Sequence, residues 1–201
     1  MVFALVLFQT LSSAVIVEDA LRQVDAAEGI TVTQLRTTEE FPRNTRWKYW
    51  FRKGGYFRAD AGTLTDISNP KEGWTFDSVK KIYQSRKPIP SDFRLTSVIG
   101  IDILRAGLPI IGQPKAMQWR GRPTVRVELD GRAKMTKETK LFVFFDPKSH
   151  LPIGVSANLG SMTQVVVYED LKLNPKIEDS KFQFVPPKTW KKVTATSGGW
   201  K

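Results

Sequence analysis

The sequence predicts a mainly β protein, an antiparallel meander with few helices. About ten short runs of alternating or β-branched residues recur at intervals of roughly 8–15 residues, separated by turn residues such as Asp130-Gly131 and Asp146-Pro147. Gaps this short join antiparallel neighbours, because a parallel crossover needs a dozen residues or more. The 201 residues are enough for one domain with its own core.

The first predicted element is a helix over residues 17–27. Its apolar residues recur at helical spacing and Glu28-Gly29 ends it. Residues 30–35 then alternate at period two, as a half-buried strand does. The apolar stripe of the helix consists of Val17, Ala20, Leu21, Val24 and Ala27. Further strands are expected at residues 45–51, 56–61, 63–67, 73–76 and 80–84.

A cluster of prolines at residues 87–91 interrupts the strands. Ser91 or Asp92 is a candidate N-cap for a helix that runs through Ala106 and ends at Gly107. This helix is apolar around most of its circumference, so it needs contacts on more than one side. Residues 108–112 are an apolar loop. Strands resume at residues 116–120, 124–129, 140–145, 153–157 and 163–169.

The composition leaves little room for catalysis. Cysteine is absent, which excludes disulfides, thiolate metal sites and a cysteine nucleophile. His150, the single histidine, lies in a predicted turn, where an exposed side chain is the simplest expectation. No glycine-rich phosphate loop joins a strand to a helix. We predict a protein that is not an enzyme, with no catalytic residue, metal site or cofactor.

The chain is strongly basic. Its 31 Lys and Arg against 20 Asp and Glu give a net charge of +11. Such a charge attracts anionic partners, which include nucleic acid, phospholipid headgroups and acidic proteins. Charge alone does not choose among them.

Residues 42–58 interleave basic and aromatic side chains without an acid. A single-stranded nucleic acid platform presents both kinds on one face. Period two separates them here, so we predict no nucleic-acid binding. The aromatic face is either ordinary core or a wall that faces a ligand. The aromatic face carries Trp47, Tyr49 and Phe51. The basic face carries Arg46, Lys48 and Arg52, with Trp50 among them.

Residues 141–145 and 165–168 are apolar without alternation. An antiparallel strand with one solvated face normally alternates, so both faces of these strands must be covered. Two arrangements remain open. The strands belong to a sandwich core, or one face lines a cavity that a ligand fills and that residues 93–111 cover as a lid.

The N-terminus predicts export. Residues 2–8 are apolar and uncharged, and Ser12 and Ala14 give the small-x-small pattern of a cleavage site. The run is shorter than the ~20 residues of a membrane-spanning helix. No Lys or Arg precedes Arg22, so a basic n-region is missing and a buried strand or helix is the alternative. We predict a signal peptide at 1–14, one domain at 15–193, a loose tail at 194–201, and a location in the periplasm or cell envelope.

Three motifs stand out in the C-terminal third: a D-P-x…L-P turn at residues 146–152, a Y-x-D-x-x-x-N-P stretch at 168–175 and an F-x-F-x-P-P end at 182–187. In these motifs the chain resembles the outer-membrane lipoprotein carrier superfamily, which comprises LolA-like proteins, LolB and RseB. Residues 53–58 are similar to the turn and Phe-Arg strand of that family. The rest of the chain, over residues 17–193, matches by the order of its elements.

This resemblance implies a curved antiparallel sheet that forms an incomplete, half-open β-barrel covered by helices on its concave face. It implies a carrier of lipids or lipoprotein acyl chains, which we expect to be a monomer. The basic charge predicts a further partner, either an anionic membrane surface or an acidic envelope protein. The alternative is an envelope sensor or protein-interaction module without a lipid. Arg58 matches an arginine that latches the lid to the sheet. The predicted cavity residues are Trp47, Tyr49, Phe51, Trp74, Phe76, Val98, Ile99, Leu104, Phe142 and Phe144.

Overall fold

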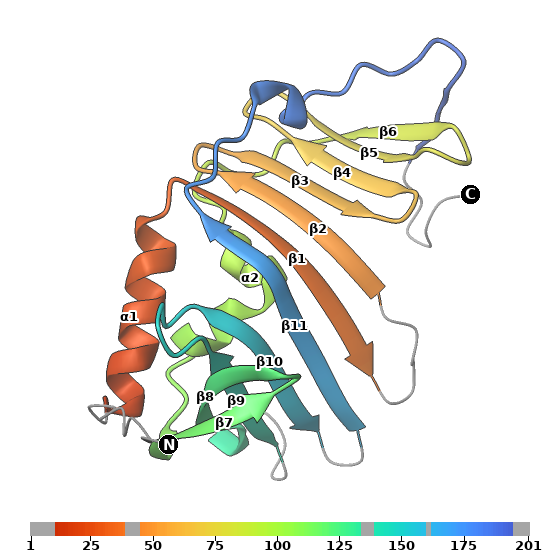
Figure 1. The fold of residues 1–201 in the computed structure, drawn as a ribbon. Helices are drawn as coiled ribbons and strands as arrows, with labels where there is room; N and C mark the ends of the chain where they lie inside the picture. The colour runs from red at the N-terminus through yellow and green to blue at the C-terminus, as the bar shows by residue number, and fades with distance from the viewer. Residues whose placement is uncertain (1–10, 39–44, 134–138, 160–161, 195–201) are drawn as a thin grey trace, which may run out of the picture.

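A computed structural model describes residues 11–38, 45–133, 139–159 and 162–194. These residues form one twelve-stranded sheet in the order β12-β6-β5-β4-β3-β2-β1-β11-β10-β9-β8-β7. Every pairing is antiparallel except that of β12 with β6. The sheet curves but its end strands, β12 and β7, do not pair with each other (Figure 1). The predicted fold class, an open curved sheet with few helices, is confirmed.

The strands fall close to their predicted positions. Their bounds are β1 Gly29–Thr38, β2 Thr45–Arg52, β3 Tyr56–Ala61, β4 Leu64–Ser68, β5 Gly73–Asp77, β6 Ile82–Arg86, β7 Ile110–Trp119, β8 Arg122–Asp130, β9 Lys140–Phe145, β10 Pro152–Leu159, β11 Met162–Leu173 and β12 Lys191–Lys192. The helices are α1 Ser13–Ala26 and α2 Leu95–Ile99, with short 3-10 turns η1 Ile101–Arg105, η2 Gly131–Ala133 and η3 Asp179–Phe182.

The first helix, α1, begins four residues before the predicted stripe. Ser12 caps it, because its hydroxyl accepts a hydrogen bond from the Val15 amide at 3.3 Å. Ile16, Val17, Ala20 and Val24 are buried against the sheet. The predicted cleavage motif, Ser12 to Ala14, is therefore the cap and first turn of α1. Residues 1–10 of the predicted signal peptide lie outside the described residues, as do residues 195–201 of the predicted tail.

The single helix predicted over residues 91–106 is wrong, because Gly100 divides it. This glycine has φ 82°, in the left-handed region, which ends α2 and starts η1. Arg94, and not Ser91 or Asp92, precedes the first helical residue. The loop predicted at residues 108–112 is also shorter than expected, since Ile110 already belongs to β7. We call α2 and η1 together the lid segment.

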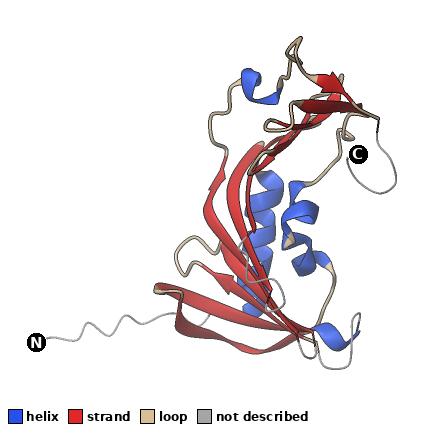
Figure 2. Ribbon diagram, turned by 90° about the vertical axis from the view of Figure 1, so that its right-hand side faces the viewer, coloured by secondary structure: helices blue, strands red, loops and turns tan. Residues whose placement is uncertain are grey.

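The two faces of the sheet are covered differently. Figure 2 shows α1 and the lid segment on the inner, concave side of the bent sheet. Strand pairing puts the partners Tyr49 and Ala59, and Phe51 and Phe57, on this inner face. The buried core joins these residues to both helices and to the inner side chains of β8, β9 and β11. From these strands it receives Val127, Leu129, Leu141, Val143, Phe145 and Tyr168.

The outer face of β3 to β6 is covered by the C-terminal segment (Figure 1). Phe184 stacks on Phe76 with ring centroids 4.3 Å apart, and Trp190 lies 5.6 Å from Phe76. Phe182 is completely buried. The chain then pairs β12 with β6, which gives that end strand a partner.

Candidate functional site

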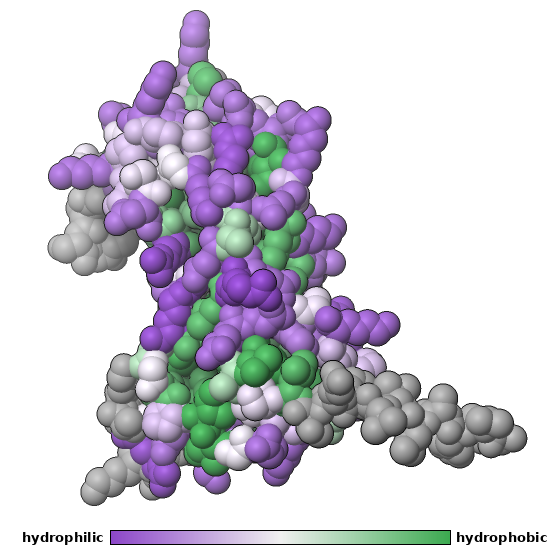
Figure 3. Space-filling model, turned by 90° about the vertical axis from the view of Figure 1, so that its left-hand side faces the viewer, coloured by the Kyte–Doolittle hydropathy of each residue, from purple (hydrophilic) through white to green (hydrophobic). Residues whose placement is uncertain are grey.

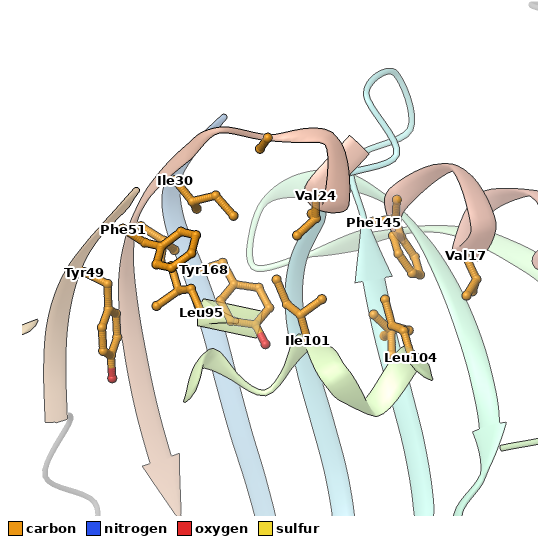
Figure 4. Packing of buried hydrophobic residues seen from close by; sticks show 14 of the residues in the cluster. Val17, Val24, Ile30, Tyr49, Phe51, Leu95, Ile101, Leu104, Phe145 and Tyr168 are labelled. Carbon is orange, nitrogen blue, oxygen red and sulfur yellow. The ribbon is translucent and has the colours of Figure 1, made fainter. Parts of the chain in front are cut away.

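The centre of the inner face is filled by the protein's own side chains. Leu95, Ile101 and Leu104 of the lid segment are buried among residues of α1 and of the sheet. Figure 4 shows Leu95 and Ile101 directed toward the strands that carry Phe51 and Tyr168. The middle of the predicted cavity is therefore occupied by the lid segment in this structure.

A cleft remains at one end of the inner face, and we call it the inner cleft. Its volume is about 470 Å³, and it lies between the C-terminal end of α1, strands β1 and β2, and residues 91–96. Its apolar walls come from Val24, Ala27, Ile30, Phe51, Phe93 and Leu95. Charged residues of the cleft are Asp25, Lys53, Asp92 and Arg94. An apolar hollow with a few polar groups is the usual form of a site for a small ligand.

Arg105 fastens the lid segment to α1. Its guanidinium donates to the Thr96 hydroxyl at 2.9 Å and forms ion pairs with Asp102 and with Asp25 of α1. Burial works to raise the pKa of the Asp102 carboxyl, but hydrogen bonds from Ser97 and Thr96 and the charge of Arg105 outweigh it and lower that pKa. Arg105 was not among the predicted site residues, although an arginine three residues after Asp102 on a helix was a visible signal of an ion pair.

Arg58, the predicted latch, lies on the outer face. It pairs across the strands with Trp50, whereas its neighbours Phe57 and Ala59 take the inner positions. Its guanidinium forms an ion pair with Asp60 at 2.8 Å and donates to the Lys181 carbonyl at 3.4 Å. The structure therefore brings Arg58 to the C-terminal segment and not to the lid segment.

The structure brings together four of the predicted cavity residues. Trp47 and Tyr49 stack on the inner face with centroids 6.0 Å apart, and Phe51 and Leu104 belong to the same core. Of these, Phe51 lines the inner cleft. Val98 and Ile99 belong to α2, but their side chains lie outside the described part of the structure.

The other four predicted cavity residues face outward. Trp74 pairs with Ile67, which pairs with Arg58, and Phe76 lies two residues along the same strand. Phe142 and Phe144 also point outward, because Val143 and Phe145 of the same strand take the inner positions. Side chains alternate between the two faces of a strand, and these four aromatic side chains fall on the outer face. The structure therefore does not bring them to the inner cleft. Trp119 covers Phe144 at 4.2 Å, and Arg126 lies over Phe142 at 4.8 Å.

A small polar network interrupts the apolar inner face. The amide oxygen of the fully buried Gln34 accepts hydrogen bonds from the Tyr49 hydroxyl at 3.3 Å and from Arg36 Nε at 3.0 Å. Burial raises the pKa of Tyr49 against the opposing charge of Arg36, and it raises the pKa of Tyr168 as well. Both phenols therefore stay neutral at ordinary pH. The sequence analysis did not predict this network, although Gln34 follows Ile30 and Val32 at period two and so occupies an inward position of the strand.

Exposed apolar residues gather where α1 and β7 begin, two elements that the Ser13 hydroxyl joins through the Gly112 carbonyl at 3.2 Å. Leu11, Val15, Ile110 and Ile111 are all exposed there. Figure 3 shows hydrophobic surface in the lower half of the molecule, the half in which these elements begin.

Within the ranges that the structure describes, no three His, Asp or Glu side chains gather as a set of metal ligands. Among the same residues, no helix has the length and apolar character to cross a bilayer.

No protein-family model matches the sequence, and no curated protein matches it. Solved structures do match. An uncharacterized conserved protein from Thermus thermophilus aligns with 90% of this chain and 97% of its own at 10% identity, with a TM-score of 0.54. LprF from Mycobacterium bovis aligns with 82% of this chain and 94% of its own at 10% identity, with a TM-score of 0.51.

A LolA superfamily protein from Nitrosomonas europaea also aligns, over 87% of this chain and 98% of its own at 10% identity, but its TM-score of 0.39 is too low to support a conclusion. The Thermus thermophilus protein and LprF share the fold of this chain. These two likenesses concern the fold alone, an open curved sheet with few helices.

Proposed function

We propose that this protein is a non-enzymatic carrier in the periplasm or cell envelope that binds an acyl chain of a lipid or lipoprotein at its inner cleft. The observation that carries the proposal is the cleft itself. The half-buried Phe93 and the buried side chains of Phe51 and Leu95 line it next to the end of α1. The carrier-like motifs of the C-terminal third support the same choice of function.

The energetics suit such a ligand. Each methylene that leaves water contributes ~0.8 kcal/mol, so a short stretch of acyl chain gives useful affinity without any polar contact. A volume of about 470 Å³ holds part of a long chain. A longer stretch requires the lid segment to move away from the sheet. Gly100 divides that segment, and prolines at residues 88 and 90 precede it, so it is connected through breaks in regular structure.

The first experiment is extraction of the purified protein followed by mass spectrometry of the released lipids. The second is titration with a fluorescent fatty acid. Phe93→Ser opens and polarises the inner cleft, and we expect it to weaken binding roughly tenfold. Phe142→Ser is the matched control, since Phe142 is also a half-buried phenylalanine but on the outer face. Equal loss in both variants, or no binding by the wild type, would contradict the proposal.

The packed centre of the inner face favours a second candidate function. If the lid segment stays in place, the protein is an envelope sensor or protein-interaction module that carries no lipid. That alternative predicts that no lipid co-purifies with the protein. It also predicts no difference between wild type and Phe93→Ser in the fatty-acid titration. It also predicts a stable complex with a protein of the envelope.

A further inference from the structure

A second cleft lies on the opposite side of the sheet, and we call it the outer cleft. It is formed by the outer face of β1, β2 and the end of β11 together with residues 175–181, and its volume is about 560 Å³. No part of the inner cleft contributes to it, so it is a separate site. Its lining includes one aromatic residue, Trp50, and four lysines.

Cations surround the Trp50 ring on this face. The Lys181 ammonium lies 4.4 Å from the ring centroid, the Lys48 ammonium 5.1 Å, and the Arg58 guanidinium 5.7 Å. Lys48 lies two residues before Trp50 on β2, and Arg58 on β3 is the strand partner of Trp50. The indole quadrupole attracts each cation, but the cations repel one another. A bound anion would remove that repulsion.

The cleft keeps an excess of positive charge. Lys48, Lys172, Lys176 and Lys181 line it against Asp170 and Glu178. Lys176 pairs with Glu178 at 3.2 Å, and Arg58 beside the cleft pairs with Asp60. In the described part of the chain, Lys48, Lys172 and Lys181 form no ion pair. Three ammonium groups thus remain for an anion.

Hydroxyl groups in the same lining narrow the kind of anion. Thr31, Thr33 and Ser180 add O–H donors beside the ammonium groups. Thr33 is only 5% exposed, so its donor belongs to the cleft wall and not to the open surface. A phosphate group has enough oxygens to accept from both ammonium and hydroxyl donors, and lysine serves phosphate as a point charge. The indole leaves apolar surface for the carbon side of an ester.

The wall that carries Lys181 is held firmly. The next residue, Phe182, is fully buried and packs on Tyr56 with centroids 5.5 Å apart. Asp179 forms an ion pair with Arg52 at 2.6 Å. Lys181 therefore stands over Trp50 without a ligand, and little ordering has to occur when one binds.

We propose that the outer cleft binds a phosphate ester, with Lys48, Lys172 and Lys181 holding the phosphate oxygens and Trp50 contacting the ester carbon. This site does not depend on the acyl-chain function of the inner cleft. A phosphate ester reaches it either as a lipid headgroup or as a soluble molecule, and the two sources need separate measurements.

The test compares wild type with Lys48→Gln/Lys181→Gln by calorimetric titration of glycerol 3-phosphate and by co-sedimentation with vesicles. The vesicles are phosphatidylcholine with or without phosphatidylglycerol. The matched control is Lys80→Gln/Lys115→Gln, which removes two exposed lysines outside the cleft and gives the same net charge. We expect the cleft variant to lose roughly tenfold in affinity and the control to lose much less.

If the cleft variant loses affinity for glycerol 3-phosphate, a soluble ester is sufficient as the ligand. If it loses affinity only for phosphatidylglycerol vesicles, the ligand is a lipid headgroup. Equal loss in the control would overturn the proposal, because the net charge and not the cleft would then cause binding. Absence of binding to both probes overturns it too, as does binding of an acidic peptide without binding of either phosphate compound. The fatty-acid titration of the inner cleft is unaffected by any of these outcomes.

Discussion

The imidazole Nδ1 of His150 lies 2.8 Å from Asp19 Oδ2, which joins the turn between β9 and β10 to α1. Gln23 reinforces the junction, because its amide donates to the Ser149 carbonyl at 2.7 Å and to Asp19 Oδ2 at 3.1 Å. The single histidine thus fixes the position of the helix that covers the inner face. It takes no part in either cleft.

This junction predicts a dependence of stability on acid. The hydrogen bond with His150 lowers the pKa of Asp19, and the nearby Arg22 lowers it further. Desolvation of the carboxyl raises this pKa but does not outweigh them, so the pKa lies below its ordinary 3.8. A lowered folded-state pKa gives stability that is complete above 3.8 and is lost as pH falls through the folded-state value. Asp19→Asn should cost about 1 kcal/mol at neutral pH, with a smaller loss below pH ~4. Urea unfolding at several pH values measures both.

Glu18→Gln is the control for this prediction. Glu18 is the neighbouring, exposed acid on α1 and forms no ion pair within the described residues. Its variant should keep the stability and the acid profile of wild type. If Asp19→Asn and Glu18→Gln behave alike, the junction does not contribute to stability.

The C-terminal segment predicts a second effect on stability. Phe184 stacks on Phe76 and also contacts Trp74, Tyr83 and Trp190 at 5.8–6.1 Å between centroids. Phe184→Ala should cost about 2 kcal/mol, since it opens a space in this aromatic cluster. Val185→Ala is the control, because Val185 is 86% exposed and its loss should change stability by less than about 0.5 kcal/mol. Chemical unfolding followed by tryptophan fluorescence distinguishes them, and a neutral Phe184→Ala contradicts the packing described.

Alternation of residues was sufficient to predict the strands, but it was not sufficient to predict their faces. Trp74 and Phe76 alternate well, yet their face depends on the register of β3 with β4 and of β4 with β5. Leu141 to Phe145 has no polar member, so its two faces look alike in the sequence. Register results from contacts far apart in the chain, which a local pattern does not contain.

The covering elements were the harder part of the prediction. Residues 174–193 have little periodicity, and only their packing on β3 to β6 shows that they protect the outer face. Without that segment, outward aromatics look like candidates for an inner cavity. The role of Arg105 was equally hidden, because its partner Asp25 is 80 residues away on α1. The division of the helix at Gly100, in contrast, had a local signal, which is the glycine itself. The helical spacing of the apolar residues around it outweighed that signal in the prediction.

Gly100 provides the last prediction, which links the lid segment to the inner cleft. Its left-handed backbone, φ 82°, is unfavourable for a residue with a side chain. An added Cβ would meet the Tyr168 hydroxyl at 3.8 Å, an ordinary contact, so backbone strain and not a clash causes the effect. Gly100→Ala should therefore cost roughly 1–2 kcal/mol, and Gly100→Asn less, because asparagine tolerates this conformation better.

The matched control is Gly62→Ala in the turn between β3 and β4, where φ is 59° and no atom lies within 4 Å of the added Cβ. Both alanine variants should lose similar stability in urea unfolding, since both carry the same kind of strain. Only Gly100→Ala should change fatty-acid binding, because only Gly100 sets how α2 and Leu95 lie against the inner cleft. If Gly62→Ala changes binding to the same extent, general destabilisation explains the result and the lid segment does not control the cleft.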